Sequence, residues 1–141
     1  MLVRSRRNDA ARGPRWHHVA PAAGYVVAVF VLGSLPQQGL PALPAIGVDK
    51  LAHAAAFLVM ALLFMRSLRL AWPGVGDRSS RWSAALAAST LGALLEVFQL
   101  AVPGRSAEWS DWIADTIGAG LAVLLVRPQW LVREPRQEEC P

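Results

Sequence analysis

The chain has 141 residues, of which 54% are hydrophobic and only 17% are charged, and its formal net charge is +4. This length fits one domain, and the high apolar content excludes an intrinsically disordered chain. The single cysteine, Cys140, excludes a disulfide scaffold. The cations lie in short blocks between long apolar runs rather than along one face, which argues against a nucleic-acid partner. The composition is typical of a small membrane protein.

Four apolar runs follow one another along the chain, and each predicts a helix. They cover residues 19–35, 53–71, 83–102 and 112–126. A helix needs about 20 residues to cross the hydrocarbon core of a bilayer, a length that the first and fourth runs reach only with their flanks. All six tryptophans lie at or just outside the ends of the runs, where the headgroups of a bilayer would lie. The predicted fold is all-α, a membrane-embedded four-helix bundle.

The distribution of cations predicts which side of the membrane each segment faces. Arginines are frequent in residues 1–18, around the second connection and in residues 127–141, whereas the first and third connections carry only Lys50 and Arg105 as cations. By the positive-inside rule, both termini and the middle connection are cytoplasmic. The expected organisation is a basic cytoplasmic tail (1–18), a four-helix transmembrane domain (19–126) and a cytoplasmic tail (127–141).

A cleaved signal peptide is an alternative interpretation of the first run, because Arg6 and Arg7 form a twin-arginine pair. Two observations disfavour it. No small-x-small cleavage site follows the run, and Asn8 and Asp9 stand where such a signal has apolar residues. We therefore expect the first run to remain as a helix of the protein.

Three of the predicted helices carry polar pairs at helical spacing. The pairs are Asp49 and His53, Glu96 and Gln99, and Asp111 and Asp115. Residues three or four apart share one face of a helix, and ionisable groups within a membrane-spanning helix usually face the bundle interior and mark a functional site. With alternating helix directions, all three pairs fall at the outer end, near Lys50 and Arg105. The sequence thus predicts a polar pocket that opens to the outside.

Small residues extend two of these polar faces along their helices. They are Ala114, Gly118 and Ala122 in the fourth run, and Ala88 and Gly92 in the third. Small residues at four-residue spacing let helix backbones approach closely in lipid. We therefore expect the polar faces to contact neighbouring helices rather than lipid.

Structural interpretations of the same polar residues remain open. The carboxylates can pair with Lys50 and Arg105 to fix the register of the helices, and His53 can be a structural histidine. Asp111 can act as the N-cap of the fourth helix, with its carboxylate accepting a backbone N–H. A cap role and a site role are compatible.

Three motifs in this region occur in a characteristic order. They are Asp49-Lys50-Leu51-Ala52-His53 followed by Phe57, then Glu96-Val97-Phe98-Gln99, then Pro103-Gly104-Arg105 leading to Asp111, Asp115, Gly118 and Gly120. Over residues 49–120 the chain resembles the VanZ-like family of small bacterial integral membrane proteins. The resemblance implies the bacterial inner membrane and a role in the cell envelope, and one family member is linked to resistance to the glycopeptide teicoplanin. The family commonly has Asn where this chain has Asp115, which adds a potential charge.

The polar residues divide into two groups of candidates. The catalytic candidates are His53, Glu96 and Asp115, residue types that exchange protons. The substrate-binding candidates are Asp49, Lys50, Gln99, Arg105 and Asp111, whose two cations suit a phosphate or carboxylate group. The expected ligand is an anionic cell-envelope molecule, such as a lipid-linked phosphate or a cell-wall precursor. Membrane lipids are the other expected partners, and an oligomer is left open.

Functions other than binding an anionic envelope molecule are also compatible with the sequence. A non-catalytic assembly or stability factor is the main alternative, so enzymatic activity is left open. A proton-linked transporter ranks lower, because no polar residue lies deep in the cytoplasmic half of any predicted helix. The cofactor is unknown: His53, Glu96, Asp111 and Asp115 are ligand types for a divalent ion such as zinc, but no paired-histidine motif accompanies them, so no metal ligand is assigned. A serine nucleophile, Ser106 or Ser110 with His53, has no supporting motif.

Overall fold

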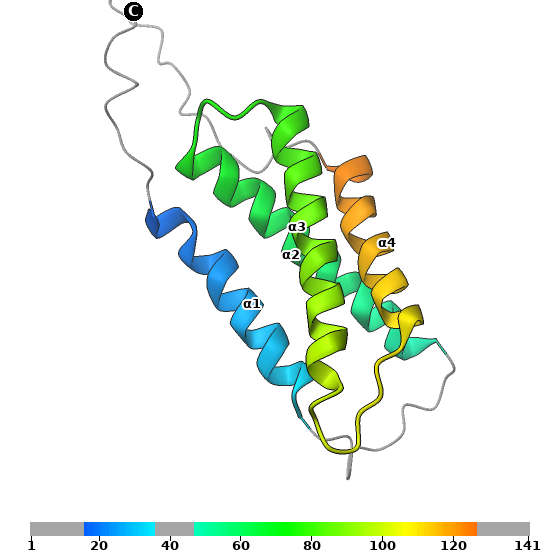
Figure 1. Ribbon diagram of the computed structural model, residues 1–141. Helices are drawn as coiled ribbons and strands as arrows, with labels where there is room; N and C mark the ends of the chain where they lie inside the picture. Colours follow the sequence, from blue (N-terminus) through cyan, green and yellow to red (C-terminus); the bar gives the residue numbers. More distant parts are fainter. Residues whose placement is uncertain (1–15, 36–46, 127–141) are drawn as a thin grey trace, which may run out of the picture.

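The computed structural model describes residues 16–35 and 47–126, and these residues form helices and no strand (Figure 1). A 3-10 turn, Trp16–His18, leads into α1 (Ala20–Gly33). Three longer helices follow: α2 (Val48–Ala71), α3 (Asp77–Gln99) and α4 (Trp109–Leu125). The predicted all-α, four-helix architecture is confirmed. The C-terminal tail with Cys140 and most of the N-terminal tail lie outside the described residues.

Two of the helices begin at least five residues before the apolar runs that predict them. Helix α2 begins at Val48 rather than at residue 53, and α3 begins at Asp77 rather than at residue 83. Their polar first turns are helical because backbone hydrogen bonds, not hydropathy, define a helix. Gly47 precedes α2 with a φ of 103°, a left-handed conformation that glycine adopts without steric cost.

Helices α2, α3 and α4 form the centre of the bundle, and α1 lies along its side (Figure 1). The core consists of large α2 side chains, including Phe57, Met60 and Met65, packed on alanines of α3 and α4. Within α1, Ala22 is the one buried residue. Helix α1 is therefore the most peripheral of the four.

Small and polar residues are buried in this bundle, and large apolar residues are exposed. Helix α4 shows the pattern clearly: Asp115 and Gly118 are buried, whereas Ile113, Ile117 and Leu124 are exposed. Such a surface is unfavourable in water and is typical of helices that associate in lipid through small residues. Two segments, Trp16–Gly33 and Val48–Ala71, are long and apolar enough to cross a bilayer.

The backbones of α2 and α4 lie close together at Gly118. A Cβ atom at this position would overlap the carbonyl oxygen of Ala54. Ala54 directly follows His53, and Gly118 lies three residues after Asp115. The glycine thus brings the two backbones together next to the predicted polar residues.

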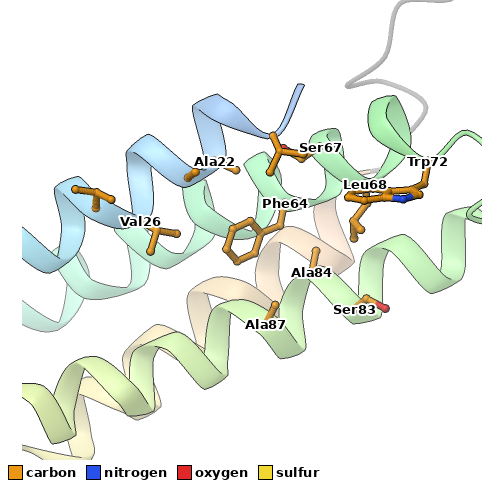
Figure 2. A pocket seen from close by; sticks show the side chains of 12 residues that line it. Ala22, Val26, Phe64, Ser67, Leu68, Trp72, Ser83, Ala84 and Ala87 are labelled. Atoms are coloured by element: carbon orange, nitrogen blue, oxygen red, sulfur yellow. The ribbon is translucent and has the colours of Figure 1, made fainter. Parts of the chain in front are cut away.

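An apolar groove of about 630 Å³ lies between α1, α2 and α3 (Figure 2). Val26, Phe64, Leu68 and Trp72 are among its lining residues, and none of its described lining residues is ionisable. Because the groove involves the start of α1 and the end of α2, it lies toward the opposite end of the bundle from Asp49 and His53.

Candidate functional site

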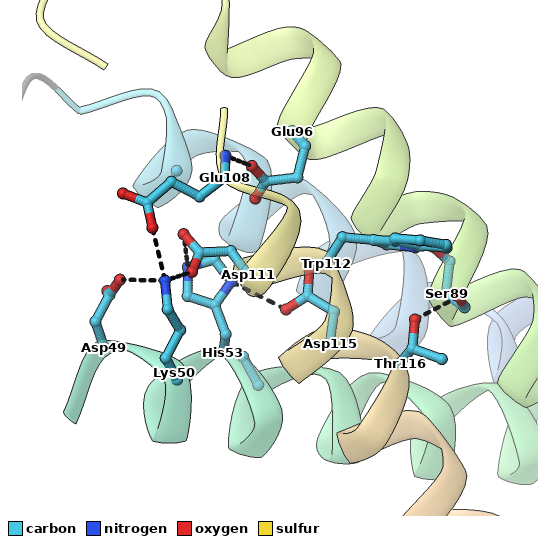
Figure 3. Close-up of polar contacts among 12 residues, drawn as sticks. Asp49, Lys50, His53, Ser89, Glu96, Glu108, Asp111, Trp112, Asp115 and Thr116 are labelled. Carbon is cyan, nitrogen blue, oxygen red and sulfur yellow. Dashed lines mark hydrogen bonds and ion pairs between the residues drawn. The ribbon is translucent and has the colours of Figure 1, made fainter. Parts of the chain in front are cut away.

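Seven ionisable side chains gather at one end of the bundle, where α2 and α4 begin and α3 approaches its end (Figure 3). We call this group the polar cluster. Its members are Asp49, Lys50 and His53 from α2, Glu96 from α3, Glu108 from the residue before α4, and Asp111 and Asp115 from α4. The expected meeting of polar residues from three helices is therefore observed.

His53 connects α2 to two carboxylates of α4. Its Nδ1 atom lies 2.9 Å from Oδ1 of Asp115, and its Nε2 atom lies 3.8 Å from Oδ2 of Asp111. Asp111 and Asp115 are four residues apart on one face of α4, which is why both reach the same imidazole. The Asp115 side chain is fully buried, and 14% of the His53 side chain is exposed.

Lys50 makes the second connection between α2 and α4. Its Nζ atom donates to Oε2 of Glu108 at 2.9 Å and to Oδ1 of Asp111 (Figure 3). Oδ2 of Asp49 lies 3.9 Å from the same nitrogen. Lys50 therefore neutralises part of the negative charge at the rim of the cluster.

Glu108 is a member of the cluster that the sequence analysis did not include. It lies outside the four apolar runs, but it precedes Asp111 by three residues and so falls on the same side of the helix start. The Lys50 ammonium group beside it lowers the pKa of the Glu108 carboxyl. A search for acidic residues within one turn of Asp111 would have found it.

Glu96 brings α3 to the cluster. Its Oε2 atom accepts a hydrogen bond of 2.8 Å from the backbone N–H of Glu108, and its Oε1 atom has no hydrogen-bond partner among the described residues. Oδ2 of Asp115 is likewise buried without a partner there. One ligand atom from each of His53, Glu96 and Asp115 lies within 4.8 Å of the other two.

Two of the predicted binding residues, Gln99 and Arg105, make contacts with the end of α1. Gln99 is buried, and its Nε2 atom donates to the carbonyl oxygen of Gly33 at 3.4 Å. Nε of Arg105 donates to the carbonyl oxygen of Leu35, also at 3.4 Å. These hydrogen bonds join the end of α3 and the following loop to the end of α1 and the residues just after it. The role of either residue in binding stays a prediction.

The interpretation of Asp111 as an N-cap is wrong. The N-cap residue of α4 is Glu108, whose own side chain makes no capping hydrogen bond. Asp111 is the third residue of α4, where its carboxylate is buried and bonded to Lys50. The helix begins earlier than the apolar run, so Asp111 lies inside it.

A second polar contact between α3 and α4 lies beside the cluster (Figure 3). Nε1 of Trp112 donates to the carbonyl oxygen of Ser89 at 3.1 Å, and the hydroxyls of Ser89 and Thr116 lie 2.8 Å apart. Sequence reasoning missed this contact, because these residue types are ordinary in a helix face. It holds α4 against α3 next to Asp115.

The polar cluster is strongly acidic. Five carboxylates face one lysine and one histidine, and Lys50 contacts three of the five. The buried carboxylates of Glu96 and Asp115 lie in the inner part, beyond the reach of the Lys50 contacts that the structure shows. This arrangement can transfer protons, and it can hold a cation.

The fold and the cluster define an all-helical protein with membrane-type helices and a buried ionisable site at one end. A family model described as VanZ/LLP1 matches residues 6–133, and the chain belongs to this family. The match extends well beyond the three motifs, and it confirms the resemblance that they indicate. No curated protein and no solved structure matches the chain.

Proposed function

We propose that this VanZ-family protein crosses the bacterial cytoplasmic membrane several times, with both termini in the cytoplasm. The polar cluster then lies near the outer surface. There it binds or acts on an anionic cell-envelope molecule, such as a lipid-linked phosphate or a cell-wall precursor, and a glycopeptide-resistance role is one form of this function.

The observation that carries this proposal is the burial of ionisable side chains at one end of an otherwise apolar bundle. Glu96 and Asp115 are 7% and 0% exposed, and each keeps one carboxylate oxygen without a partner among the described residues. A buried charge without full compensation costs stability, and ionisable residues in membrane helices typically mark functional sites. A role in binding a ligand would account for this loss of stability.

The rim of the cluster offers cations to an anionic group. The Lys50 side chain is 35% exposed, and its partner Glu108 is 54% exposed. A phosphate or carboxylate of a ligand can therefore replace Glu108 beside Lys50. Arg105 lies in the loop before Glu108, and its guanidinium group suits a second contact with the same anion.

The inner part of the cluster supports chemistry on the bound group. A histidine in contact with a carboxylate is a suitable general acid or base, and the His53–Asp115 pair has this geometry at 2.9 Å. Glu96 supplies a further carboxylate beside the pair. His53, Glu96 and Asp115 remain our candidates for catalysis.

One observation favours the alternative, a non-catalytic assembly or stability factor. The Lys50–Asp111 and His53–Asp115 contacts both join α2 to α4, so they also fix the register of these helices. In that case their removal lowers the stability of the protein, and an anionic ligand is not required.

A binding experiment separates the two functions. We would measure the binding of a fluorescent polyprenyl phosphate, and of the matching polyprenol without phosphate, to the full-length protein in nanodiscs. We expect the phosphate to bind more tightly, and Lys50→Gln and Arg105→Gln each to weaken its binding by about tenfold or more, since hydrogen bonds to charged groups contribute about 1.5–3 kcal/mol.

Arg69→Gln is the matched control, because Arg69 pairs with Asp77 at the other end of the bundle. We expect it to bind the phosphate like the unchanged protein. Equal binding of phosphate and alcohol would contradict the proposed function. If Lys50→Gln at the same time lowered the unfolding temperature, the assembly factor would be favoured.

A further inference from the structure

Two buried carboxylate oxygens of the polar cluster, one on Glu96 and one on Asp115, have no hydrogen-bond partner among the described residues. The protein holds one oxygen of each carboxylate: Oε2 of Glu96 accepts the N–H of Glu108, and Oδ1 of Asp115 lies 2.9 Å from the His53 ring. The other oxygens, Oε1 of Glu96 and Oδ2 of Asp115, are buried without a partner among the described residues. Both side chains are more than nine-tenths buried.

His53 completes a set of three ligand atoms from three different helices. One atom each of His53, Glu96 and Asp115 lies within 4.8 Å of the other two. Ligand atoms around a tetrahedral zinc ion lie about 3.3 Å apart, given metal–ligand distances near 2.0–2.2 Å. Side-chain movements of about an ångström therefore close this set around an ion.

We propose that His53, Glu96 and Asp115 bind one divalent transition-metal ion, such as Zn²⁺ or Mn²⁺. An imidazole nitrogen with two carboxylate oxygens is a ligand set for such ions. The other oxygen of Glu96 accepts a hydrogen bond from the N–H of Glu108, which orients this carboxylate as in many metal sites. The contact between Asp115 and His53 joins two of the proposed ligands, and the ion would take the place of its proton. The ion would link α2, α3 and α4 at the end of the bundle.

A second group of three, Asp49, His53 and Asp111, has atoms within the same distance limit. Its carboxylates are less suited to a metal ion. Asp111 is bonded to Lys50, and the side chain of Asp49 is 57% exposed. We therefore assign the ion to the buried set, and we use Asp49 as the control.

The charge of the cluster supports a cation. Five carboxylates outnumber a single lysine and a histidine, so the cluster has an excess of groups that can carry negative charge. A divalent ion offsets two of these charges and offers an open position to an oxygen ligand. The ion site itself does not rest on the identity of the envelope molecule, and it is testable without one.

The test uses tag-free, full-length protein in detergent, from which metal ions have been removed with a chelator. It is titrated separately with ZnCl₂, MnCl₂ and MgCl₂, and binding is measured by calorimetry. We expect one ion per chain and a rise in the unfolding temperature on binding. Glu96→Gln and Asp115→Asn keep the size of each side chain. Each amide also keeps one oxygen that can accept the existing hydrogen bond, from the N–H of Glu108 or from His53. Each should weaken binding by about tenfold or more, the scale on which even supporting residues of metal sites act.

Asp49→Asn is the matched control, with an affinity within about twofold of the unchanged protein, below the scale of a lost ligand. Absence of stoichiometric binding, equal or tighter binding of Mg²⁺, or an equal loss in Asp49→Asn would overturn the proposal. The unfolding temperature of each metal-free variant shows whether it is folded. If one of the two amide variants does not fold, the metal affinity of the other still tests the proposed site.

Discussion

The two sides of this bundle are held together in different ways. At the polar end, α4 and the residue before it contact α2 and α3 through ionisable side chains, and Gly118 of α4 lies against the backbone of α2. On the other side, α1 borders an apolar groove and buries only Ala22 among its own residues. The first side allows little variation in residue size or charge. The second is held by ordinary apolar contacts and a few hydrogen bonds.

This difference supports our proposal that the polar cluster is a functional site. Apolar contacts and a few hydrogen bonds hold α1, so buried charge is not needed to build a bundle of this kind. Two buried carboxylate oxygens of the polar cluster have no partner among the described residues, a cost that an apolar contact would avoid. Functional sites are commonly less stable than a protein interior permits.

The largest effect is expected for Gly118→Ala. Its Cβ atom would overlap the carbonyl oxygen of Ala54, and a backbone atom cannot rotate away. The helices must separate, which also moves Asp115 away from His53, and we expect a loss of about 3 kcal/mol or more, as for overpacked cores. Thermal unfolding in detergent measures it. Gly120→Ala is the matched control, since a Cβ there meets nothing within 4 Å; an equal loss in this variant would refute the close contact.

A smaller loss is expected for Gly92→Ala in α3. Its Cβ atom would lie 2.7 Å from Oδ2 of Asp115, which must shift within the cluster. We expect a cost of about 1–3 kcal/mol and weaker zinc binding, measured by unfolding and calorimetry. Gly24→Ala, in α1, has nothing within 4 Å and should change neither quantity. If Gly24→Ala proved as harmful, the contrast between the two sides would not hold.

A hydrogen bond between α1 and α2 tests the apolar side. The hydroxyl of Tyr25 donates to the carbonyl oxygen of Ala56 at 3.1 Å. Tyr25→Phe removes this bond and keeps the ring, and such bonds in membrane proteins contribute about 0.6 kcal/mol on average. We expect a small fall in the unfolding temperature. A fall in unfolding temperature as large as that of Gly92→Ala would show that contacts of α1 stabilise the protein as much as contacts of the other helices do.

The smallest effect concerns pH at the rim of the cluster. Lys50 lowers the pKa of Glu108 below its value in the unfolded chain. The stability from this contact is therefore fully present above about pH 4.3, the ordinary pKa of Glu, and it is lost as the pH falls through the lower, folded-state pKa. Glu108→Gln should remove this part of the acid dependence, measured as unfolding temperature between pH 6 and pH 3. An unchanged dependence would show that the contact adds no stability.

The order of the helices and most of the polar cluster were predictable from the sequence. The apolar runs indicate four helices, and the spacing of Asp49 with His53 and of Asp111 with Asp115 places each pair on one face. Gly118, four residues from Ala114 and Ala122, indicates a close helix contact. These signals are local to one helix, which is why a single sequence contains them.

The misplaced residues depend on information that is not local. Gln99 follows Glu96 by three residues, a rotation of about 300° that leaves it offset by about 60°, and this offset turns it toward Gly33 of α1. Which neighbour lies on that side depends on the packing of the whole bundle. Glu108 was missed because it lies just before α4 and hydropathy does not mark polar residues at a helix start.

The central claim is that the polar cluster serves a ligand rather than the packing of the bundle. The unfolding temperature of metal-free Glu96→Gln tests it most directly. Gln keeps an acceptor for the N–H of Glu108 and removes a buried charge whose second oxygen has no partner among the described residues. We predict an unfolding temperature equal to or above that of the unchanged protein. A fall as large as that of Gly92→Ala would show that the carboxylate holds the helices together, and would contradict the account.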